Sequence, residues 1–339
     1  MTKPLVCARI VRTQNGAVHF SPTLDRLWKA ASELGQPELL LLGNDLKLLE
    51  RQAEGISGYS KVLIACTETG QALQVEMAAA VVSSLVKEHS SAEWSHILAE
   101  TDSFGRELMA HLAARMMTAL VTEVIAIEDA NTFIRPVHAG VIQETVRVSQ
   151  RDGEDELPVL ITIRPTGFPV SDDLIQPTAP DSIQRLDTLS DNERVRVIDE
   201  HASPVADQDL TSAQVVVGIG GGVGDKEGVA LIEQLANHLG GAIAATRTAV
   251  DSGLVSNDLQ VGQTGRIIAP KLYFAIGISG AIQHLAGIKD AGAIVSINSD
   301  PNAPIHAAAD LALAADLRQA IPELIAHISQ RSETVLLDR

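Results

Sequence analysis

The stretch "VGQTGRIIAPKLYFAIGISGAIQH", residues 261–284, decides the fold of the carboxyl-terminal half of the chain. It contains a short apolar run typical of a strand, then a turn with two glycines, and then the start of a helix. Its Gln, Thr, Ser and His side chains are not ones that a hydrophobic core requires. We therefore expect a strand–turn–helix unit that also binds a ligand.

Strand-like runs and helical patterns alternate on both sides of this stretch. In the second half they are the strand "AQVVVG", the turn "GIGGGVGD", the helix "KEGVALIEQLANHLG", the strands "AIAAT" and "AIVSI", and a last helix from Asp316. In the first half the strand-like runs are "LVCARIV", "ELLLLG", "KVLIAC", "HILAET" and "VTEVIAI". This alternation predicts an α/β fold of two domains, each a mostly parallel sheet with flanking helices.

Between the halves, residues 170–212 are rich in Asp, Ser, Pro and Gln and lose the alternating pattern. Such a stretch is typical of a domain join. We predict an amino-terminal α/β domain at 1–200, a linker at 201–212, and a Rossmann-like ligand-binding domain at 213–339.

Composition excludes several classes of function. Asp and Glu outnumber Lys and Arg by 43 to 26 in 339 residues, giving a formal net charge of -17, so nucleic acid and anionic membranes are poor partners. Aromatic residues are 3% of the chain, which disfavours single-stranded nucleic acid. Cys7 and Cys66 have no metal-binding spacing, and the first residues show no signal-peptide pattern. We therefore predict a metal-free cytoplasmic protein.

Three turns follow predicted strands, at the edge where open α/β sheets bind ligands. In "GIGGGVGD" the glycines allow backbone N–H groups to approach a phosphate, but a tight strand-to-helix connection explains the pattern equally well. In "FAIGISGAIQHLAG" and "INSDPNAP" the turns carry polar side chains. The sequence has no G-x-S-x-G or H-E-x-x-H motif, so hydrolase chemistry is not indicated.

The chain resembles the alpha subunit of electron transfer flavoprotein. The resemblance rests on "TRTAVDSGLVSNDLQVGQTGRIIAPKLYFAIGISGAIQHLAGIKDAGAIVSIN", "DPNAPIHAAAD" and "ADL" in the second half. It is looser in the first half, at "ANTFIRPVHAGVIQETV" and "ITIRPTGFP". It implies an FAD-containing electron carrier, not itself an enzyme, that forms a heterodimer with a beta subunit. The domain at 1–200 would contact that subunit, and the domain at 213–339 would bind FAD. Flavoprotein dehydrogenases would donate electrons to this carrier, and a membrane quinone oxidoreductase or a similar protein would accept electrons from it.

The resemblance also implies which residues hold FAD. Arg247 and Thr264 would lie near the redox-active part of the flavin ring, and His284 near its pyrimidine oxygens. The complete set is Gly221, Thr246, Arg247, Val261, Gly262, Gln263, Thr264, Ser279, Gly280, Ala281, Ile282, Gln283, His284, Asn298, Asp316 and Leu317. A guanidinium and an imidazole beside the flavin suit the negative charge that a reduced flavin carries.

Two positions depart from the family pattern. Thr246 stands where the family usually has Ser, and Gly221 stands where the family has the arginine of "GGRG".

Two alternative functions stay open. One is a subunit of a bifurcating electron transfer flavoprotein, in which a second flavin in the partner oxidises NADH; the other, suggested by Gly221, is a flavin-free interaction subunit.

Overall fold

The computed structural model describes residues 3–12, 18–20, 23–67, 72–88, 93–138, 140–149, 157–170, 182–186, 198, 210 and 213–337. The chain divides into two compact units, 1–201 and 202–339. The predicted linker 201–212 lies outside the described residues except for Leu210, so the predicted domain boundaries stay a prediction. Leu210 is buried and packs into the core of the second unit.

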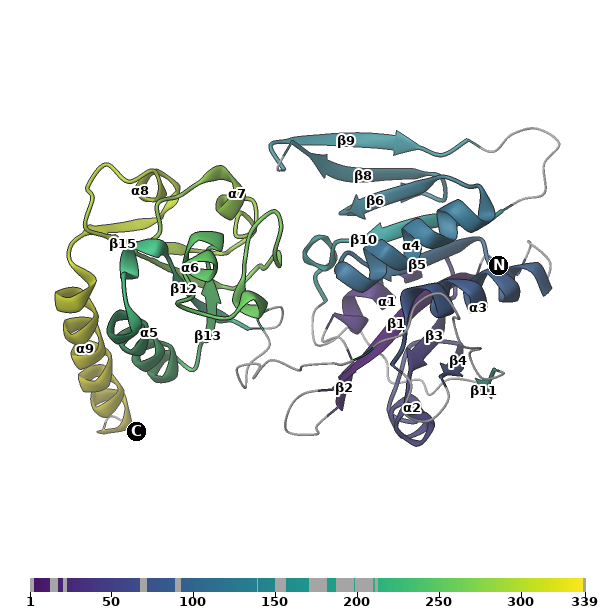
Figure 1. Ribbon diagram of the computed structural model, residues 1–339, viewed down its shortest axis with the longest axis horizontal. Coiled ribbons are helices and arrows are strands. Elements are labelled where there is room, and N and C mark those ends of the chain that lie inside the picture. Colours follow the sequence, from purple (N-terminus) through teal and green to yellow (C-terminus); the bar gives the residue numbers. More distant parts are fainter. Residues whose placement is uncertain are drawn as a thin grey trace. The chain divides into compact units, whose positions relative to one another are not determined.

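The first unit is built on a parallel sheet with the strand order β11-β4-β3-β1-β5-β10-β6, and the short β2 pairs antiparallel with β1 (Figure 1). Its strands are β1 (Pro4–Arg12), β2 (Val18–Phe20), β3 (Glu38–Gly43), β4 (Lys61–Cys66), β5 (His96–Glu100), β6 (Leu120–Val124), β10 (Val159–Ile163) and β11 (Ser182–Arg185). Its helices are α1 (Leu24–Ser32), α2 (Leu46–Ala53), α3 (Val75–Glu88) and α4 (Ser103–Met116), with a 3₁₀ turn η1 at Pro165–Gly167. The predicted mostly parallel sheet with flanking helices is confirmed.

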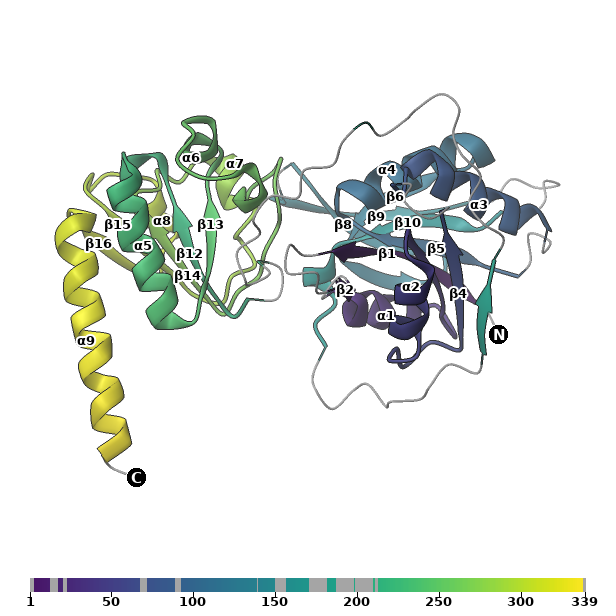
Figure 2. The same cartoon turned by 60° about the horizontal axis from the view of Figure 1, so that its bottom comes forward.

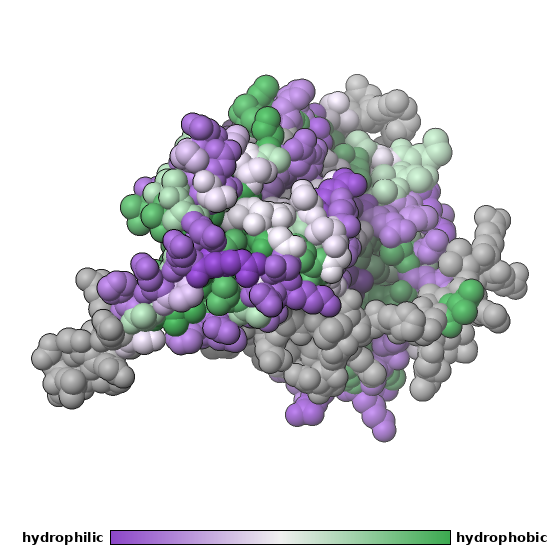
Figure 3. Space-filling view, turned by 60° about the vertical axis from the view of Figure 1, so that its left-hand side comes forward, coloured by the Kyte–Doolittle hydropathy of each residue, from purple (hydrophilic) through white to green (hydrophobic). Residues whose placement is uncertain are grey.

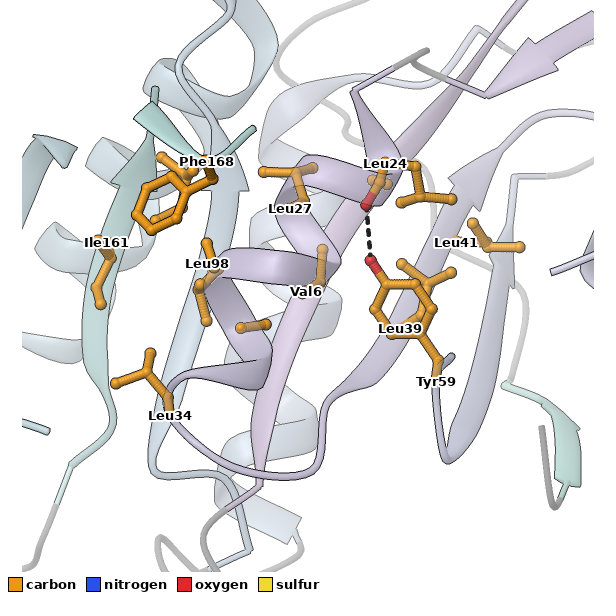
Figure 4. Close-up of a cluster of buried hydrophobic side chains, with 14 of the residues drawn as sticks. Val6, Leu24, Leu27, Leu34, Leu39, Leu41, Tyr59, Leu98, Ile161 and Phe168 are labelled. Carbon is orange, nitrogen blue, oxygen red and sulfur yellow. Dashed lines mark hydrogen bonds between the residues drawn. The ribbon is translucent and has the colours of Figure 1, made fainter. Parts of the chain in front are cut away.

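Helices cover both faces of this sheet, and central strands such as β3 and β10 are therefore buried along their whole length. All six residues of β3 are buried, and its alternate leucines point into two separate cores. Figure 4 shows one of these cores, in which Val6, Leu39, Leu98 and Ile161 of the sheet pack with residues of α1. At its edge the Tyr59 hydroxyl donates to the Leu24 carbonyl at 3.2 Å.

A three-stranded antiparallel sheet in the first unit was not expected from the sequence. It contains β7 (Ala126–Asp129), β8 (Thr132–Val137) and β9 (Ile142–Arg147). The run "VTEVIAI", which suggests one strand, is divided between β6 and β7. Glu123 has a φ of 61°, a conformation that a regular strand does not contain, and pairing with the parallel sheet ends one residue later, at Val124.

The second unit holds a five-stranded sheet with the order β13-β12-β14-β15-β16, in which every pair is parallel. The strands are β12 (Val215–Ile219), β13 (Ala242–Ala245), β14 (Leu272–Ile276), β15 (Ile294–Asn298) and β16 (Leu311–Ala314). The helices are α5 (Lys226–Leu239), α6 (Arg247–Asp251), α7 (Ile282–Leu285), α8 (Ile305–Ala308) and α9 (Leu317–Leu337), with 3₁₀ turns η2 (Gly221–Val223) and η3 (Asn257–Leu259). The predicted Rossmann-like arrangement is confirmed, since β13 and β14 pair with opposite edges of β12, and the strand order of the sheet therefore reverses at β12.

Two different layers cover the faces of the second sheet. Long helices α5 and α9 pack on one face, as Figure 2 shows, with Ile232 and Ile321 fully buried there. The other face is covered by the 260–270 segment, α7 and α8, through Val261, Ile268 and Ile305. On the side of this unit where α9 lies, hydrophilic residues are interspersed with small hydrophobic patches (Figure 3). Among the described helices, none is both long and apolar enough to cross a membrane.

Candidate functional site

All of the residues singled out from the sequence lie at one edge of the second sheet. Because the five strands are parallel, their carboxyl ends meet at this edge. Gly221 follows β12, Thr246 and Arg247 follow β13, and the 277–284 segment follows β14. Asn298 ends β15, while Asp316 and Leu317 follow β16. Four strand spacings separate the outer strands, about 19 Å, so the edge is long enough for an extended dinucleotide.

The segment 261–264 follows no strand directly, yet it reaches the same edge. Gln260 forms a bridge with Ala245, the last residue of β13, and Val261 N–H donates to the Ala245 carbonyl at 2.9 Å. Gln263 N–H donates to the Gln283 carbonyl at 2.8 Å. The segment is therefore fixed between the ends of β13 and α7.

The glycine turns after β12 and β14 pack directly against each other. Gly220 N–H donates to Ile276 O at 2.9 Å, and Gly222 N–H donates to Gly277 O at 3.0 Å. A Cβ at Gly220 would overlap the Gly277 carbonyl, and one at Gly222 would lie 2.8 Å from the same oxygen. These two glycines are required by close backbone packing, so the structural explanation of "GIGGGVGD" accounts for them without a phosphate.

Gly221 has no such requirement. It is exposed, its φ is not positive, and a Cβ there would meet only the Thr248 side chain, with Cγ2 at 2.8 Å. Thr248 is itself exposed and can rotate its methyl group away. A positive φ does not explain the glycine at 221 either, since in this loop Gly224 has that conformation, with a φ of 85°. A longer side chain at 221 would start beside α6.

The turn after β14 presents backbone donors. The N–H groups of Ser279, Gly280 and Ala281 form no hydrogen bond with any described residue. Gly280 has a φ of 90°, and a Cβ there would lie 2.7 Å from the Ile305 Cα. The turn is thus held by α8 on one side, while its N–H groups stay available to an acceptor such as a diphosphate oxygen.

Arg247 and Thr246 form the start of α6. The Thr246 hydroxyl caps this helix by accepting from Ala249 N–H at 3.3 Å, which any hydroxyl residue there would do. The Arg247 side chain is 70% exposed, and its Nε lies 3.4 Å from the Asp251 carboxylate in a weak surface ion pair. The guanidinium is therefore able to turn toward a ligand.

His284 occupies a different environment from the other polar residues of the site. It is buried, with Nδ1 3.0 Å from the Val261 carbonyl and Nε2 3.1 Å from the Tyr273 hydroxyl. Burial lowers the pKa of His284, and the hydrogen bond to Val261 acts in the opposite direction. Both ring nitrogens thus bond to protein atoms, and the ring acts here as a connection between β14 and the 261–264 segment.

At the other end of the edge, polar side chains fix the strand ends. Asn298 donates from Nδ2 to the Ile278 carbonyl at 2.8 Å, and Asp316 accepts from Arg318 N–H at 2.8 Å. The Arg318 guanidinium lies 2.6 Å from Asp225, the N-cap of α5. Hydrogen bonding from Gly228 N–H, followed by that from Arg318, lowers the pKa of Asp225, so this carboxylate is satisfied within the protein.

The predicted contacts divide into two groups by exposure. Residues that can touch a ligand with their side chains or exposed backbone are Gly221, Arg247, Gln263, Thr264, Ser279, Ala281, Ile282, Gln283 and Asp316, with Asn298 half-buried. The buried ones are Thr246, Val261, Gly262, Gly280, His284 and Leu317. The buried group holds the turns in place. Sequence reasoning missed Tyr273 and Gly218, which lie inside strands with no polar neighbour to mark them.

The residues of the edge fit an FAD. Free backbone N–H groups beside Gly280 suit the diphosphate, an exposed guanidinium at Arg247 suits an electron-rich ring, and the length of the edge suits two linked nucleotides. Among the described residues, no group of three or more His, Cys, Asp or Glu side chains could hold a metal ion.

Comparison with known proteins identifies the second unit as an FAD-binding domain. Residues 10–189 match the electron transfer flavoprotein domain, and residues 209–289 match the electron transfer flavoprotein FAD-binding domain. The chain is 38% identical over 318 residues to the mitochondrial electron transfer flavoprotein subunit alpha of Arabidopsis thaliana, covering 89% of this chain and 84% of that protein. The chain belongs to the electron transfer flavoprotein alpha-subunit family.

Bacterial members of this family align over nearly their whole length. The subunit alpha of Pseudomonas aeruginosa is 35% identical over 315 residues, covering 93% of this chain and 97% of the relative. That of Paracoccus denitrificans is 38% identical over 310 residues, covering 91% and 96%. The family's FAD-binding domain includes the predicted contacts as far as His284, whereas Asn298, Asp316 and Leu317 lie beyond the matched residues.

Proposed function

We propose that this chain is the alpha subunit of a heterodimeric electron carrier and holds one FAD along the carboxyl edge of its second sheet. The observation that supports this most directly is the convergence of every predicted contact on that edge, from loops far apart in the sequence. A bound FAD would supply one- and two-electron redox chemistry. The chain's own part is to hold the diphosphate on backbone N–H groups and to place Arg247 beside the ring.

We expect about one FAD per heterodimer on this subunit, because the exposed donors of the edge are arranged for a dinucleotide. Denaturation of the purified pair, followed by chromatography of the released flavin, measures both identity and stoichiometry. Release of FMN, or of no flavin from a folded pair, would contradict the proposal. The absorption spectrum of the purified pair also tests the alternative of a flavin-free interaction subunit, which predicts no flavin absorbance.

The partner in this proposal is an electron transfer flavoprotein beta subunit, and the first unit provides the contact surface. We expect the chain expressed alone to aggregate or to lose flavin, since a surface meant for a subunit would be exposed. Size-exclusion chromatography of the chain with and without the beta subunit measures this. A stable, flavin-loaded monomer would contradict an obligate heterodimer.

The proposal also includes the route of the electrons. Flavoprotein dehydrogenases donate, a membrane quinone oxidoreductase or a similar protein accepts, and the subunit itself transforms no metabolite. The bifurcating alternative predicts that NADH bleaches the flavin absorbance of the purified pair. The cytoplasm is the proposed compartment, and cell fractionation tests it, since relatives include mitochondrial proteins as well as bacterial ones.

Gly221→Arg is expected to raise the reduction potential of bound flavin by tens of millivolts. A screened positive charge near the ring stabilises reduced, more anionic forms by on the order of 1 kcal/mol, and about 1.4 kcal/mol corresponds to roughly 59 mV for one electron. The backbone at 221 accepts a side chain once Thr248 rotates. Redox titration of the loaded pair measures the shift.

Gly221→Ala is the matched control, because it introduces the same Cβ contact with Thr248 and no charge. We expect its potential to equal that of the parent. An arginine variant that holds flavin at an unchanged or lowered potential would refute the charge argument.

A further inference from the structure

A buried chain of hydrogen bonds runs behind the flavin-facing edge of the second unit. It begins at Tyr273, which is fully buried in β14, and passes through His284 of α7 to the carbonyl of Val261. Val261 in turn donates its N–H to Ala245 at the end of β13. These hydrogen bonds connect β14 with β13 through the side chain of His284. From the sequence, that side chain was expected to contact the flavin directly.

The direction of each hydrogen bond follows from the chemistry of the groups. A carbonyl oxygen only accepts, so Nδ1 of His284 carries the proton that is shared with Val261. In a neutral imidazole Nε2 is then an acceptor, and the Tyr273 hydroxyl is its donor. Burial disfavours the imidazolium and the phenolate alike, lowering the pKa of His284 and raising that of Tyr273, so both groups are neutral.

The neighbouring strand leaves space for this arrangement. A Cβ at Gly218 of β12 would lie 2.5 Å from Cζ of Tyr273 and would overlap its hydroxyl. Tyr273 and Val216 are paired across β14 and β12, so the ring extends over Gly218, two residues further along β12. A glycine in the middle of a buried strand weakens it, and here the missing side chain is what admits the hydroxyl.

We propose that Tyr273 is a positioning residue for the flavin site: its hydroxyl holds the His284 ring in the neutral Nδ1–H form, and that ring fixes the 261–264 turn. The part that concerns flavin rests on the proposed function. Gln263 and Thr264 are exposed in this turn, and their backbone is placed by Val261 and by the bond from Gln263 N–H to Gln283 O. Tyr273 therefore acts on the ligand only through His284 and the turn.

Nitrogen NMR detects these hydrogen bonds directly. The sample is the full-length protein, labelled with ¹⁵N-histidine and purified with any subunit that accompanies it. His284→Gln assigns the signal. We expect a neutral ring at pH 7, protonated at Nδ1, with Nε2 shifted by an accepted hydrogen bond. In Tyr273→Phe the Nε2 signal should move to the position of an imine nitrogen without a donor. An Nε2–H form or an imidazolium in the parent would overturn the proposal.

The effect on the ligand is measured with FAD itself as the probe. Tyr273→Phe should weaken FAD binding about tenfold, equivalent to about 1.4 kcal/mol. The free protein relieves the buried Nε2 that has lost its donor by moving the His284 ring and the 261–264 turn, and FAD binding must then restore the turn at that cost. Tyr59→Phe is the matched control: it removes a buried tyrosine hydroxyl whose 3.2 Å bond to Leu24 lies in the first unit. It should change neither the His284 signal nor FAD affinity.

The two measurements separate the two proposals. If Tyr273→Phe moves the Nε2 signal but leaves FAD affinity equal to that of Tyr59→Phe, the positioning role is refuted. If the parent binds no FAD, the proposed function fails, and the nitrogen spectra alone decide whether Tyr273 holds His284.

Discussion

Gly280→Ala is expected to abolish detectable FAD binding and to lower the unfolding free energy of the second unit by about 3 kcal/mol or more. Two costs add at this position. The φ of 90° costs an alanine about 1–2 kcal/mol. The new Cβ would also overlap backbone atoms of Ile305, which cannot rotate away as a side chain could, and such overpacking costs a further 1–3 kcal/mol. The turn must move, and the N–H groups of Ser279 and Ala281 move with it.

Gly240→Ala separates the cost of the positive φ from the cost of the overlap with a neighbouring backbone. Gly240 also has a positive φ, 60°, but a Cβ there meets nothing within 4 Å. It ends α5 at the amino edge of the sheet, away from the predicted flavin contacts. We expect a loss of about 1–2 kcal/mol in unfolding free energy and unchanged FAD affinity. Thermal unfolding and FAD titration of both variants measure this, and equal FAD affinities would show that the turn does not hold the ligand.

Arg247→Gln is expected to lower the potential of the bound flavin by tens of millivolts. The reduced ring is more negative than the oxidised one, so removal of a nearby guanidinium destabilises the reduced form. With 70% of the side chain exposed, screening limits the interaction to on the order of 1–2 kcal/mol, or roughly 40–90 mV for one electron. Redox titration of the FAD-loaded pair measures the change.

Two further variants test the same charge. Arg247→Lys keeps the positive charge and should retain most of the potential. Asp251→Asn removes the carboxylate that lies 3.4 Å from Arg247 Nε and should raise the potential slightly, because the guanidinium is no longer partly neutralised. If Arg247→Gln and Arg247→Lys shift the potential equally, the effect comes from shape and the charge interpretation is wrong.

Much of the fold could be predicted from the sequence because its elements are local. The limits of β3 and β4 equal the apolar runs "ELLLLG" and "KVLIAC", and α5 begins at Lys226 directly after its N-cap Asp225. These runs are buried on both faces, so hydrophobicity alone marks them. The antiparallel sheet β7-β8-β9 could not be predicted in this way, since its pairing depends on where the chain leaves β6, near Glu123.

For the site, the sequence by itself determined the residue types and their order along the chain: a glycine turn after a strand, a hydroxyl at Thr246, a polar turn before His284. Only the tertiary structure decided which of them face outward. Ser279 and Arg247 are exposed, whereas His284 is buried, with its Nε2 3.1 Å from the hydroxyl of Tyr273, which extends over Gly218 of the neighbouring strand. The physical reason is that exposure depends on what packs across the sheet, and contacts between strands far apart in the sequence leave no local pattern.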